Sequence, residues 1–310
     1  MKVLNQVKHW VGKITYAALE MFPVCVKNKI ALMIYLLQND PDSLMVNYEW
    51  RKWRDVTPDK IDRHFRGLDA KSIGTIKEFI LRTRVFPLAH PRFHHPFIWP
   101  ALCSEAQYRI WTEAESQMLS AKHRYHLPEE ANELSSLVYH HGLNELDRAR
   151  REYIRGKVFI DAGAFVGDSA LVMLEHGPAK VVAFEPMPSI ARQFEETMRR
   201  NAVPPGRVEL VRRGLSDSPG AVCFRENSSG STCDSRGEVR VDLVTLDEYL
   251  QKHSPEAKCG FIKADLEGMG LAMLRGALGT IRRDRPVLSL SIYHNQEEFW
   301  GIYDLLRSLG

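Results

Sequence analysis

Glycines and acidic residues that could build a ligand-binding turn follow an apolar run in the second half of the sequence. The segment reads Asp161-Ala-Gly163-Ala-Phe-Val-Gly167-Asp168-Ser169. Glycine at 163 lets the main chain turn tightly and approach a ligand, and free amides near Asp168 and Ser169 supply donors where a helix begins. The spacing lacks the Gly-x-Gly-x-x-Gly pattern of dinucleotide sites. It therefore favours an adenosine ligand that is less anionic than a pyrophosphate.

A second carboxylate ends the next apolar run, in Phe184-Glu185-Pro186, 24 residues after Asp161. An acidic side chain at the end of the second strand of a parallel sheet can accept hydrogen bonds from both hydroxyls of a ribose. We therefore predict that Glu185 binds ribose. Asp161 has two interpretations, since its carboxylate could order the glycine turn and receive an ammonium group of the ligand, or it could be a purely structural cap.

The candidates for proton transfer follow the later apolar runs. Asp265 and Glu267 alternate along an extended segment, which predicts shared acceptor binding and proton abstraction. A divalent metal held by this pair is the alternative, but we predict no metal site. His294 lies just past another run, and its usual pKa of about 6.5 suits proton removal, although it could instead cap the last helix. We predict Asp265, Glu267 and His294 as the catalytic residues.

Other groups of residues give less specific signals. Lys263 could orient the acceptor or pair with a neighbouring carboxylate. The segment His140-His141-Gly142 could cover the pocket as a lid or have a structural role. A loop with four prolines, 86–100, carries three histidines that could be metal ligands but more simply pack on their neighbours: His90, His94 and His95.

These residues must be positioned by a regular alternation of strands and helices that begins near residue 151. Short β-branched runs alternating with helical stretches are typical of a parallel sheet with crossover helices. The predicted strands are 158–161, 181–184, 208–211, 260–265 and 287–293, with an inserted hairpin from 221–225 and 238–245. The predicted helices are 168–176, 189–201, 269–283 and 296–309. The fold class is therefore α/β, a Rossmann-like sheet with helices on both faces.

The first part of the chain has a different character. Its apolar spacing predicts helices over 1–22, 28–38, 72–84 and 104–123, and no segment alternates convincingly as a strand. We therefore predict two domains, a mostly helical region of residues 1–135 with no assigned role and an α/β domain of residues 136–310.

Composition excludes several classes of protein. The 310 residues are 44% hydrophobic and 26% charged, which is typical of a folded globular protein. A net charge of +3 falls far short of the basic surface that nucleic acid requires, so we expect no nucleic-acid partner. The five cysteines form no C-x-x-C pair and indicate neither disulfides nor a zinc site. We expect a reducing, cytoplasmic location and no membrane span, with weak interfacial attachment of residues 3–22 as the alternative.

Six ordered motifs in the α/β part resemble the FkbM family of S-adenosylmethionine-dependent methyltransferases. The motifs are F-I-D-A-G-A-F-V-G-D-S from Phe159, A-F-E-P at 183–186, G-L-S-D at 214–217, V-T-L-D-E-Y-L at 244–250, F-I-K-A-D-L-E-G at 261–268 with M-L-R-G-A at 273–277, and R-P-V-L-S-L at 285–290. Together they cover roughly residues 140–309. The resemblance implies a class I methyltransferase sheet, S-adenosyl-L-methionine as cofactor, and methylation of hydroxyl oxygens, often on sugars or glycosylated products.

The resemblance also implies roles for individual residues. Asp161, Gly163 and Gly167 match the cofactor loop, Glu185 the ribose position, Asp217 the adenine region, and Lys263, Asp265 and Glu267 the place where donor and acceptor meet. The chain departs from the family pattern in two places. The common E-G-x-E continues here as Glu267-Gly268-Met269-Gly270, so that later carboxylate is absent or moved. Two further strands would also follow 296–309 in the family, so the sheet is truncated or its edge is closed differently.

The sequence thus predicts an S-adenosylmethionine-dependent O-methyltransferase that acts on a hydroxyl of a saccharide or glycoconjugate. Residues 1–135 would shape the acceptor site or mediate a homodimer. Two other functions stay open at this point. One is a non-catalytic ligand-binding module on the same fold. The other is a nicotinamide-dependent oxidoreductase, although such an enzyme would require the Gly-x-Gly-x-x-Gly turn that this sequence lacks.

Overall fold

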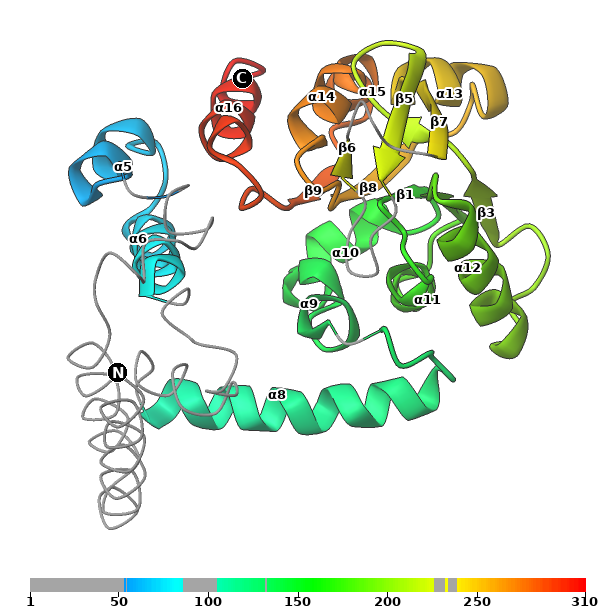
Figure 1. The fold of residues 1–310 in the computed structure, drawn as a ribbon, viewed down its shortest axis with the longest axis horizontal. Helices are drawn as coiled ribbons and strands as arrows, with labels where there is room; N and C mark the ends of the chain where they lie inside the picture. The colour runs from blue at the N-terminus through cyan, green and yellow to red at the C-terminus, as the bar shows by residue number, and fades with distance from the viewer. Residues whose placement is uncertain (1–52, 54, 86–104, 132, 226–231, 234–238) are drawn as a thin grey trace, which may run out of the picture. The chain divides into compact units, whose positions relative to one another are not determined.

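The computed structural model describes residues 53, 55–85, 105–131, 133–225, 232–233 and 239–310 (Figure 1). The chain divides into two compact units, Met1–Glu113 and Ala114–Gly310, which we describe separately. The second unit holds the whole α/β sheet. The predicted division at residues 135 and 136 follows sequence character and stays a prediction.

In the first unit, the described residues form helices. They comprise α5 (Pro58–His64), α6 (Ala70–Val85) and the start of α8 (Glu105–Arg124). Thr57 caps α5, because its hydroxyl accepts a hydrogen bond from the amide of Lys60 at 3.3 Å. The helices predicted over 72–84 and 104–123 are confirmed. Those predicted over 1–22 and 28–38, and the histidine-bearing loop 86–100, lie outside the described residues.

The second unit is built on five parallel strands in the order β3-β2-β1-β8-β9. They are β1 (Val158–Ala162), β2 (Lys180–Phe184), β3 (Val208–Val211), β8 (Cys259–Ala264) and β9 (Val287–Leu290). The predicted α/β fold class is confirmed. Because the order reverses between β1 and β8, their carboxyl ends flank the crevice where such sheets bind ligands.

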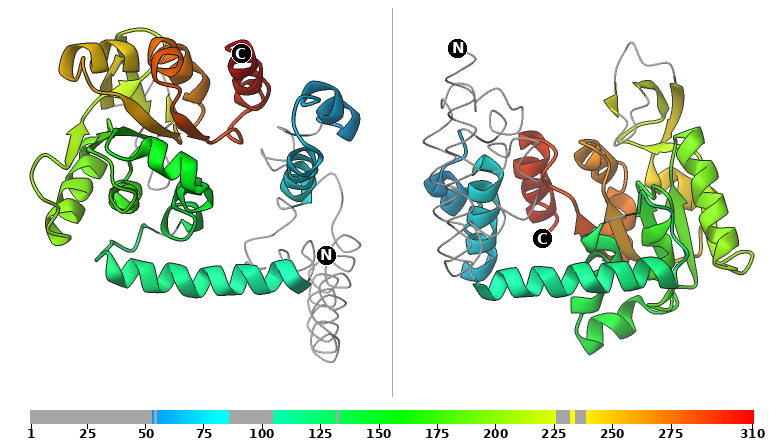
Figure 2. Two further views of the ribbon diagram at one scale, coloured as in Figure 1. Left: turned by 180° about the vertical axis from the view of Figure 1, so that it is seen from behind. Right: turned by 60° about the horizontal axis from the view of Figure 1, so that its bottom comes forward.

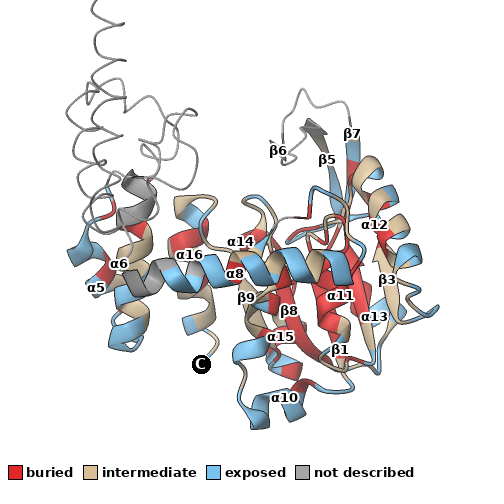
Figure 3. Ribbon diagram, turned by 90° about the horizontal axis from the view of Figure 1, so that it is seen from below, coloured by how far each residue is buried: buried red, intermediate tan, exposed pale blue. Residues whose placement is uncertain are grey.

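Alternating side chains of the central strands pack on the two faces of this sheet. Phe159 and Phe261 face a cluster that includes residues of α10 (Arg148–Ile154), α11 (Asp168–Leu174) and α12 (Pro188–Arg200). Ile160 and Ile262 face the opposite cluster, built with α13 (Leu246–His253), α14 (Gly270–Arg275), α15 (Leu278–Asp284) and α16 (Gln296–Arg307). Figure 2 shows the two groups of helices from behind, and Figure 3 shows the buried strands between them. Burial on both faces explains why these strands are mostly apolar, with Asp161 of β1 and Lys263 of β8 as charged exceptions near their carboxyl ends.

A smaller sheet adjoins the domain, in the order β4-β7-β5-β6. Its strands are β4 (Gly214–Leu215), β5 (Gly220–Arg225), β6 (Thr232–Cys233) and β7 (Val239–Val244). The antiparallel pairing of β5 with β7, with Ala221 opposite Asp242, confirms the predicted hairpin.

Two predicted elements were wrong in extent. The helix predicted over 269–283 is broken after Arg275, at Gly276 and Ala277. A side chain at Gly276 would overlap the backbone oxygen of Ser216, so this position requires glycine. The strand predicted to run to residue 293 ends at Leu290. The missed helix α13 begins after Thr245, whose hydroxyl accepts from the amide of Glu248 at 3.1 Å. Capping by threonine with glutamate three residues later was a readable signal for this helix.

None of the helices in the described parts of the chain combines the length and apolar character that a bilayer crossing requires.

Candidate functional site

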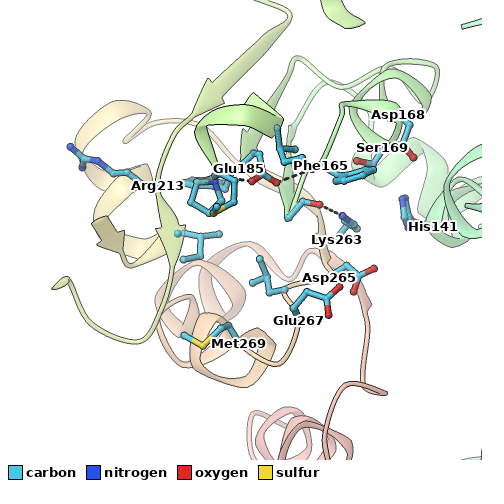
Figure 4. Close-up of a pocket in the computed structure, with 18 of the residues that line it drawn as sticks. His141, Phe165, Asp168, Ser169, Glu185, Arg213, Lys263, Asp265, Glu267 and Met269 are labelled. Atoms are coloured by element: carbon cyan, nitrogen blue, oxygen red, sulfur yellow. Dashed lines mark hydrogen bonds between the residues drawn. The ribbon is translucent and has the colours of Figure 1, made fainter. Parts of the chain in front are cut away.

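A pocket lies at the carboxyl ends of β1, β2 and β8 (Figure 4). It is lined by the loop after β1, the turn after β2, the β3–β4 connection, the segment after β8, and a stretch before β1. That stretch contains α9 (Leu134–Leu137) and the 3-10 helix η2 (His140–Glu145). The pocket thus occupies the crevice where the strand order reverses.

Two glycines shape the loop after β1, and Gly163 forms the tight turn that the sequence predicts. Gly163 has φ +80°, and a side chain there would overlap the backbone oxygen of Asp265. Gly167 has φ +93° and is the N-cap residue of α11. A Cβ at Gly167 would approach the Met198 side chain to 2.7 Å. The left-handed conformation and the lack of space both require glycine.

Asp161 lies beneath this loop and does not line the pocket. It is fully buried, and one carboxylate oxygen accepts a hydrogen bond from the Ser169 hydroxyl at 2.6 Å. The other oxygen lies 3.3 Å from the ammonium nitrogen of Lys263, which also donates to the backbone oxygen of Gly163 at 2.5 Å. Burial opposes the charged form of Lys263, but the carboxylates around it, Asp161 first, raise its pKa. This pair fixes the loop, and it favours the purely structural interpretation of Asp161.

Glu185 faces the pocket from the end of β2. Its carboxylate accepts hydrogen bonds from the amides of Met187 at 2.9 Å and Phe165 at 3.1 Å. Burial raises the pKa of Glu185 to about 7, although these two amides oppose the shift. Both oxygens keep further acceptor capacity, which can serve a pair of neighbouring hydroxyls.

Of the other residues predicted to contact the nucleoside, some line the pocket and others lie outside it. Asp168 and Ser169 line the pocket at the start of α11, whereas Gly167 and Asp217 do not. Asp217 instead accepts a hydrogen bond from the hydroxyl of Ser218 at 3.0 Å. Beyond Glu185, the pocket is closed by a mostly apolar group with one cation: Met187, Ile190, Arg213, Leu215 and Leu243. A flat, partly apolar ring such as adenine fits that composition.

The three predicted catalytic residues come together at the β8 end. The Nε2 atom of His294 lies 3.1 Å from an oxygen of Asp265 and 3.7 Å from an oxygen of Glu267. Its Nδ1 atom lies 3.3 Å from Glu298, a residue of α16 that the sequence did not single out. Glu267 has the left-handed φ of +48°, which is strained for a residue with a side chain. Asp265 and Glu267 line the pocket, and His294 lies behind them.

Asp265 and His294 determine each other's protonation state. Burial opposes ionisation of Asp265, but His294 and then Lys263 lower its pKa to about 2. Burial likewise opposes the charged form of His294, but Asp265 and Glu298 raise its pKa to about 9. The imidazole is therefore protonated at neutral pH. That state favours a role in holding Asp265, and the sequence-based assignment of His294 as the base stays a prediction.

The departure from the E-G-x-E pattern has a structural counterpart. Glu298 is 1% exposed and accepts a hydrogen bond at 2.5 Å from the amide of Gly270. A Cβ on Gly270 would lie 2.9 Å from that same oxygen. A carboxylate from α16 thus lies against the position where the pattern would place a glutamate side chain.

Sequence reasoning missed several pocket residues. Phe165, Arg213 and Glu133 gave no signal by type or spacing, and His141 was one of two open candidates. His141 lines the pocket, whereas His140 turns away to form a hydrogen bond of 3.0 Å with His176. Across the described residues, no three His, Cys, Asp or Glu side chains are grouped as a metal ion would need.

Comparisons with known proteins place this geometry in context. None of the curated proteins matches the chain significantly. Among solved structures, the chain is similar to a methyltransferase FkbM from Methylobacillus flagellatus, with 17% identity, a TM-score of 0.42 and coverage of 78% of this chain and 65% of that one. The chain therefore spans less than two thirds of that protein.

Two further structures are similar over shorter stretches. One is a Streptococcus mutans protein assigned as a methyltransferase and solved with SAH, at 13% identity and a TM-score of 0.34 over 53% of this chain and 84% of that one. The other is an SAH-bound methyltransferase from Podospora anserina, at 16% identity and a TM-score of 0.34 over 61% of this chain and 67% of that one.

The family comparison bears directly on the pocket. Residues 161–310, which supply most of its wall, match the model of the methyltransferase FkbM domain. The predicted family resemblance is confirmed, and with it the predicted cofactor at the level of the family, which uses S-adenosylmethionine. The family resemblance of this chain is thus carried by residues 161–310, which match the methyltransferase FkbM domain.

Proposed function

We propose that the chain is an S-adenosylmethionine-dependent O-methyltransferase that acts on a hydroxyl of a saccharide or glycoconjugate. The observation that carries this proposal is the group of hydrogen-bond acceptors at the β8 end of the pocket. Asp265 lies there with the hydroxyl of Tyr293 3.2 Å away, and Glu267 lies beside it. This polar lining fits a hydroxylated acceptor better than it fits an apolar acceptor.

When bound, S-adenosylmethionine supplies a methyl group on a positively charged sulfur. The chain must then align the acceptor oxygen and receive its proton. Asp265 is ionised and held by His294, so it can accept a hydrogen bond from the attacking hydroxyl. The proton would pass from the hydroxyl to the Asp265 carboxylate as the methyl group moves from the sulfur to the acceptor oxygen. A weak base suffices, because the oxygen becomes strongly acidic as it gains the methyl group.

Replacing Asp265 with asparagine should lower methyl transfer by about 100-fold or more, since the amide cannot take the proton. The experiment incubates the protein with labelled S-adenosylmethionine and a panel of glycans, and it counts both methylated product and S-adenosylhomocysteine. Asp242→Asn, an exposed strand residue, is the matched control. Wild-type turnover in Asp265→Asn would remove Asp265 from the mechanism. Intact cofactor binding by the wild type without transfer to any glycan would favour the non-catalytic module.

The affinity for S-adenosylmethionine should rise with pH up to about 7 and then level off. Burial makes Glu185 protonated below that pH, and only its carboxylate form accepts hydrogen bonds from both ribose hydroxyls. Calorimetry between pH 6 and 8.5 measures this. Glu185→Gln should bind about tenfold more weakly above pH 7 and lose most of the pH dependence. Glu195→Gln, on the surface of α12, should behave as wild type. A flat wild-type profile would contradict the ribose assignment.

A reducing, cytoplasmic location forms part of the proposal. Cys223 and Cys259 are free thiols among the described residues, and burial raises the pKa of Cys259 to about 12. Such a thiol is unreactive. Homodimerisation through residues 1–135 stays a prediction.

A further inference from the structure

The α9–η2 segment, residues 133–145, brings two polar side chains to the pocket from outside the family match. Glu133 precedes α9 and His141 belongs to η2, and both line the pocket. We propose that these two residues hold the α-amino acid end of S-adenosylmethionine, with Glu133 receiving its ammonium group and His141 its carboxylate. The inference rests on the cofactor named above and does not depend on the acceptor.

The direction of the bound cofactor follows from the strand order. In the proposed binding mode, the ribose lies against Glu185 at the end of β2, and adenine lies against the apolar side chains around Leu215 and Leu243. Because β1 separates β2 from β8, the other end of the ligand must cross the Gly163 turn toward Lys263. Figure 4 shows His141 on that side of the pocket, with Asp168 and Lys263 and away from Arg213.

Asp161 cannot take the ammonium group as the structure stands. It has no exposed surface, and both of its oxygens already face Ser169 and Lys263. Lys263 in turn is occupied by Asp161 and by the Gly163 carbonyl. The side chains that remain available to bind the ammonium and carboxylate groups of the amino acid therefore include Glu133 and His141 of the α9–η2 segment.

His141 has the properties of a donor to a carboxylate. Its Nε2 atom is buried and has no hydrogen-bond partner among the described residues. Burial, and then the charge of Lys263, lower the pKa of His141 to about 4, so the ring is neutral and one nitrogen can donate. His141 and Gly142 have left-handed backbones, with φ of +52° and +83°, and the neighbouring His140–His176 bond holds this turn against α11. The ring is thus held in place before the ligand arrives.

Glu133 has the properties of a partner for a cation. The Ser135 hydroxyl donates to one of its oxygens at 3.1 Å. Glu133 is exposed on its outer side, but partial desolvation, and then the negative charges of Asp168 and Asp265, raise its pKa. An ammonium group placed there would relieve this repulsion.

Two ligands separate the amino acid end from the rest of the cofactor. S-Adenosylhomocysteine carries the amino acid without the sulfonium charge, and 5′-methylthioadenosine has the same adenosine and sulfur but no amino acid. In calorimetry on the full chain, Glu133→Gln and His141→Ala should each lower the affinity for S-adenosylhomocysteine about tenfold, which is the loss expected for one charged hydrogen bond. Affinity for 5′-methylthioadenosine should change less than about twofold. The matched controls, Glu130→Gln and His123→Gln, replace exposed residues that do not line the pocket.

Each other outcome overturns the inference in a distinct way. Unchanged S-adenosylhomocysteine binding in both variants would show that the amino acid lies elsewhere. An equal loss of affinity for both ligands would mean that the α9–η2 segment only maintains the shape of the pocket. If His141→Ala is misfolded, Glu133→Gln decides the question, because glutamine keeps the size and shape of glutamate. A wild type that binds neither ligand would overturn the cofactor assignment as well. Binding as expected without any methyl transfer would defeat only the proposed reaction.

Discussion

Replacing Lys263 with methionine should lower the free energy of unfolding by about 3 to 5 kcal/mol, the cost of leaving a buried charge without its partner. Lys263 is 5% exposed and Asp161 is fully buried, so water cannot replace the missing ammonium group. The variant also loses the hydrogen bond to the Gly163 carbonyl, so cofactor affinity should fall with stability. Urea unfolding followed by circular dichroism measures the first effect, and calorimetry measures the second.

The control for this substitution is an ion pair of the same type nearer to water. Lys180 pairs with Glu209, and their side chains are 30% and 32% exposed. Lys180→Met should cost at most about 1 kcal/mol, because solvent screens such pairs. Adding Asp161→Asn to Lys263→Met should restore part of the loss, since it removes the unpaired charge. A loss below about 1 kcal/mol in Lys263→Met would contradict the buried-pair assignment.

Gly163→Ala should destabilise the domain by about 2 to 5 kcal/mol and weaken cofactor binding. A left-handed alanine costs about 1 to 2 kcal/mol, and forcing its methyl group against the Asp265 carbonyl adds an overpacking cost of about 1 to 3 kcal/mol. Relief of that overlap must move either the turn after β1 or the end of β8, and both line the pocket.

Gly206 separates these two costs. It has φ +83°, close to the +80° of Gly163, but a Cβ there would meet no atom within 4 Å. Gly206→Ala should therefore show only the backbone cost of about 1 to 2 kcal/mol and unchanged cofactor affinity. If the two alanine variants lose equal stability and bind the cofactor equally well, the close approach of Gly163 to β8 has no energetic role.

The sequence placed the glycine turn and Glu185 at the ends of the correct strands, because these positions depend on local structure. The turn at Gly163 and the carboxylate of Glu185 each lie at a strand end, and strands buried on both faces are readable as short apolar runs. Adjacent parallel strands then bring their carboxyl ends together without further information. The predicted strands 158–161, 181–184 and 208–211 accordingly agree with β1, β2 and β3 to within one residue.

The broken helix at Gly276 shows where local patterns fail. The apolar period continues through this position, but the backbone of Ser216 passes so close that no side chain fits. Ser216 is 60 positions earlier in the chain, so a pattern read along the sequence cannot register it. Glu298 is a comparable case, because it contacts Gly270 and His294 only after α16 has packed on α14.

The sequence by itself determined the order of strands and helices along the chain, the glycine turn, the carboxylate of Glu185 at the end of β2 and the family resemblance, since each depends on residues close together in the chain. Only the tertiary structure decided which charges meet. It buried Asp161 against Lys263, surrounded His294 with carboxylates, and brought Glu133 and His141 to the pocket. Protonation states depend on such long-range neighbours and on burial, and neither has a local signature in sequence.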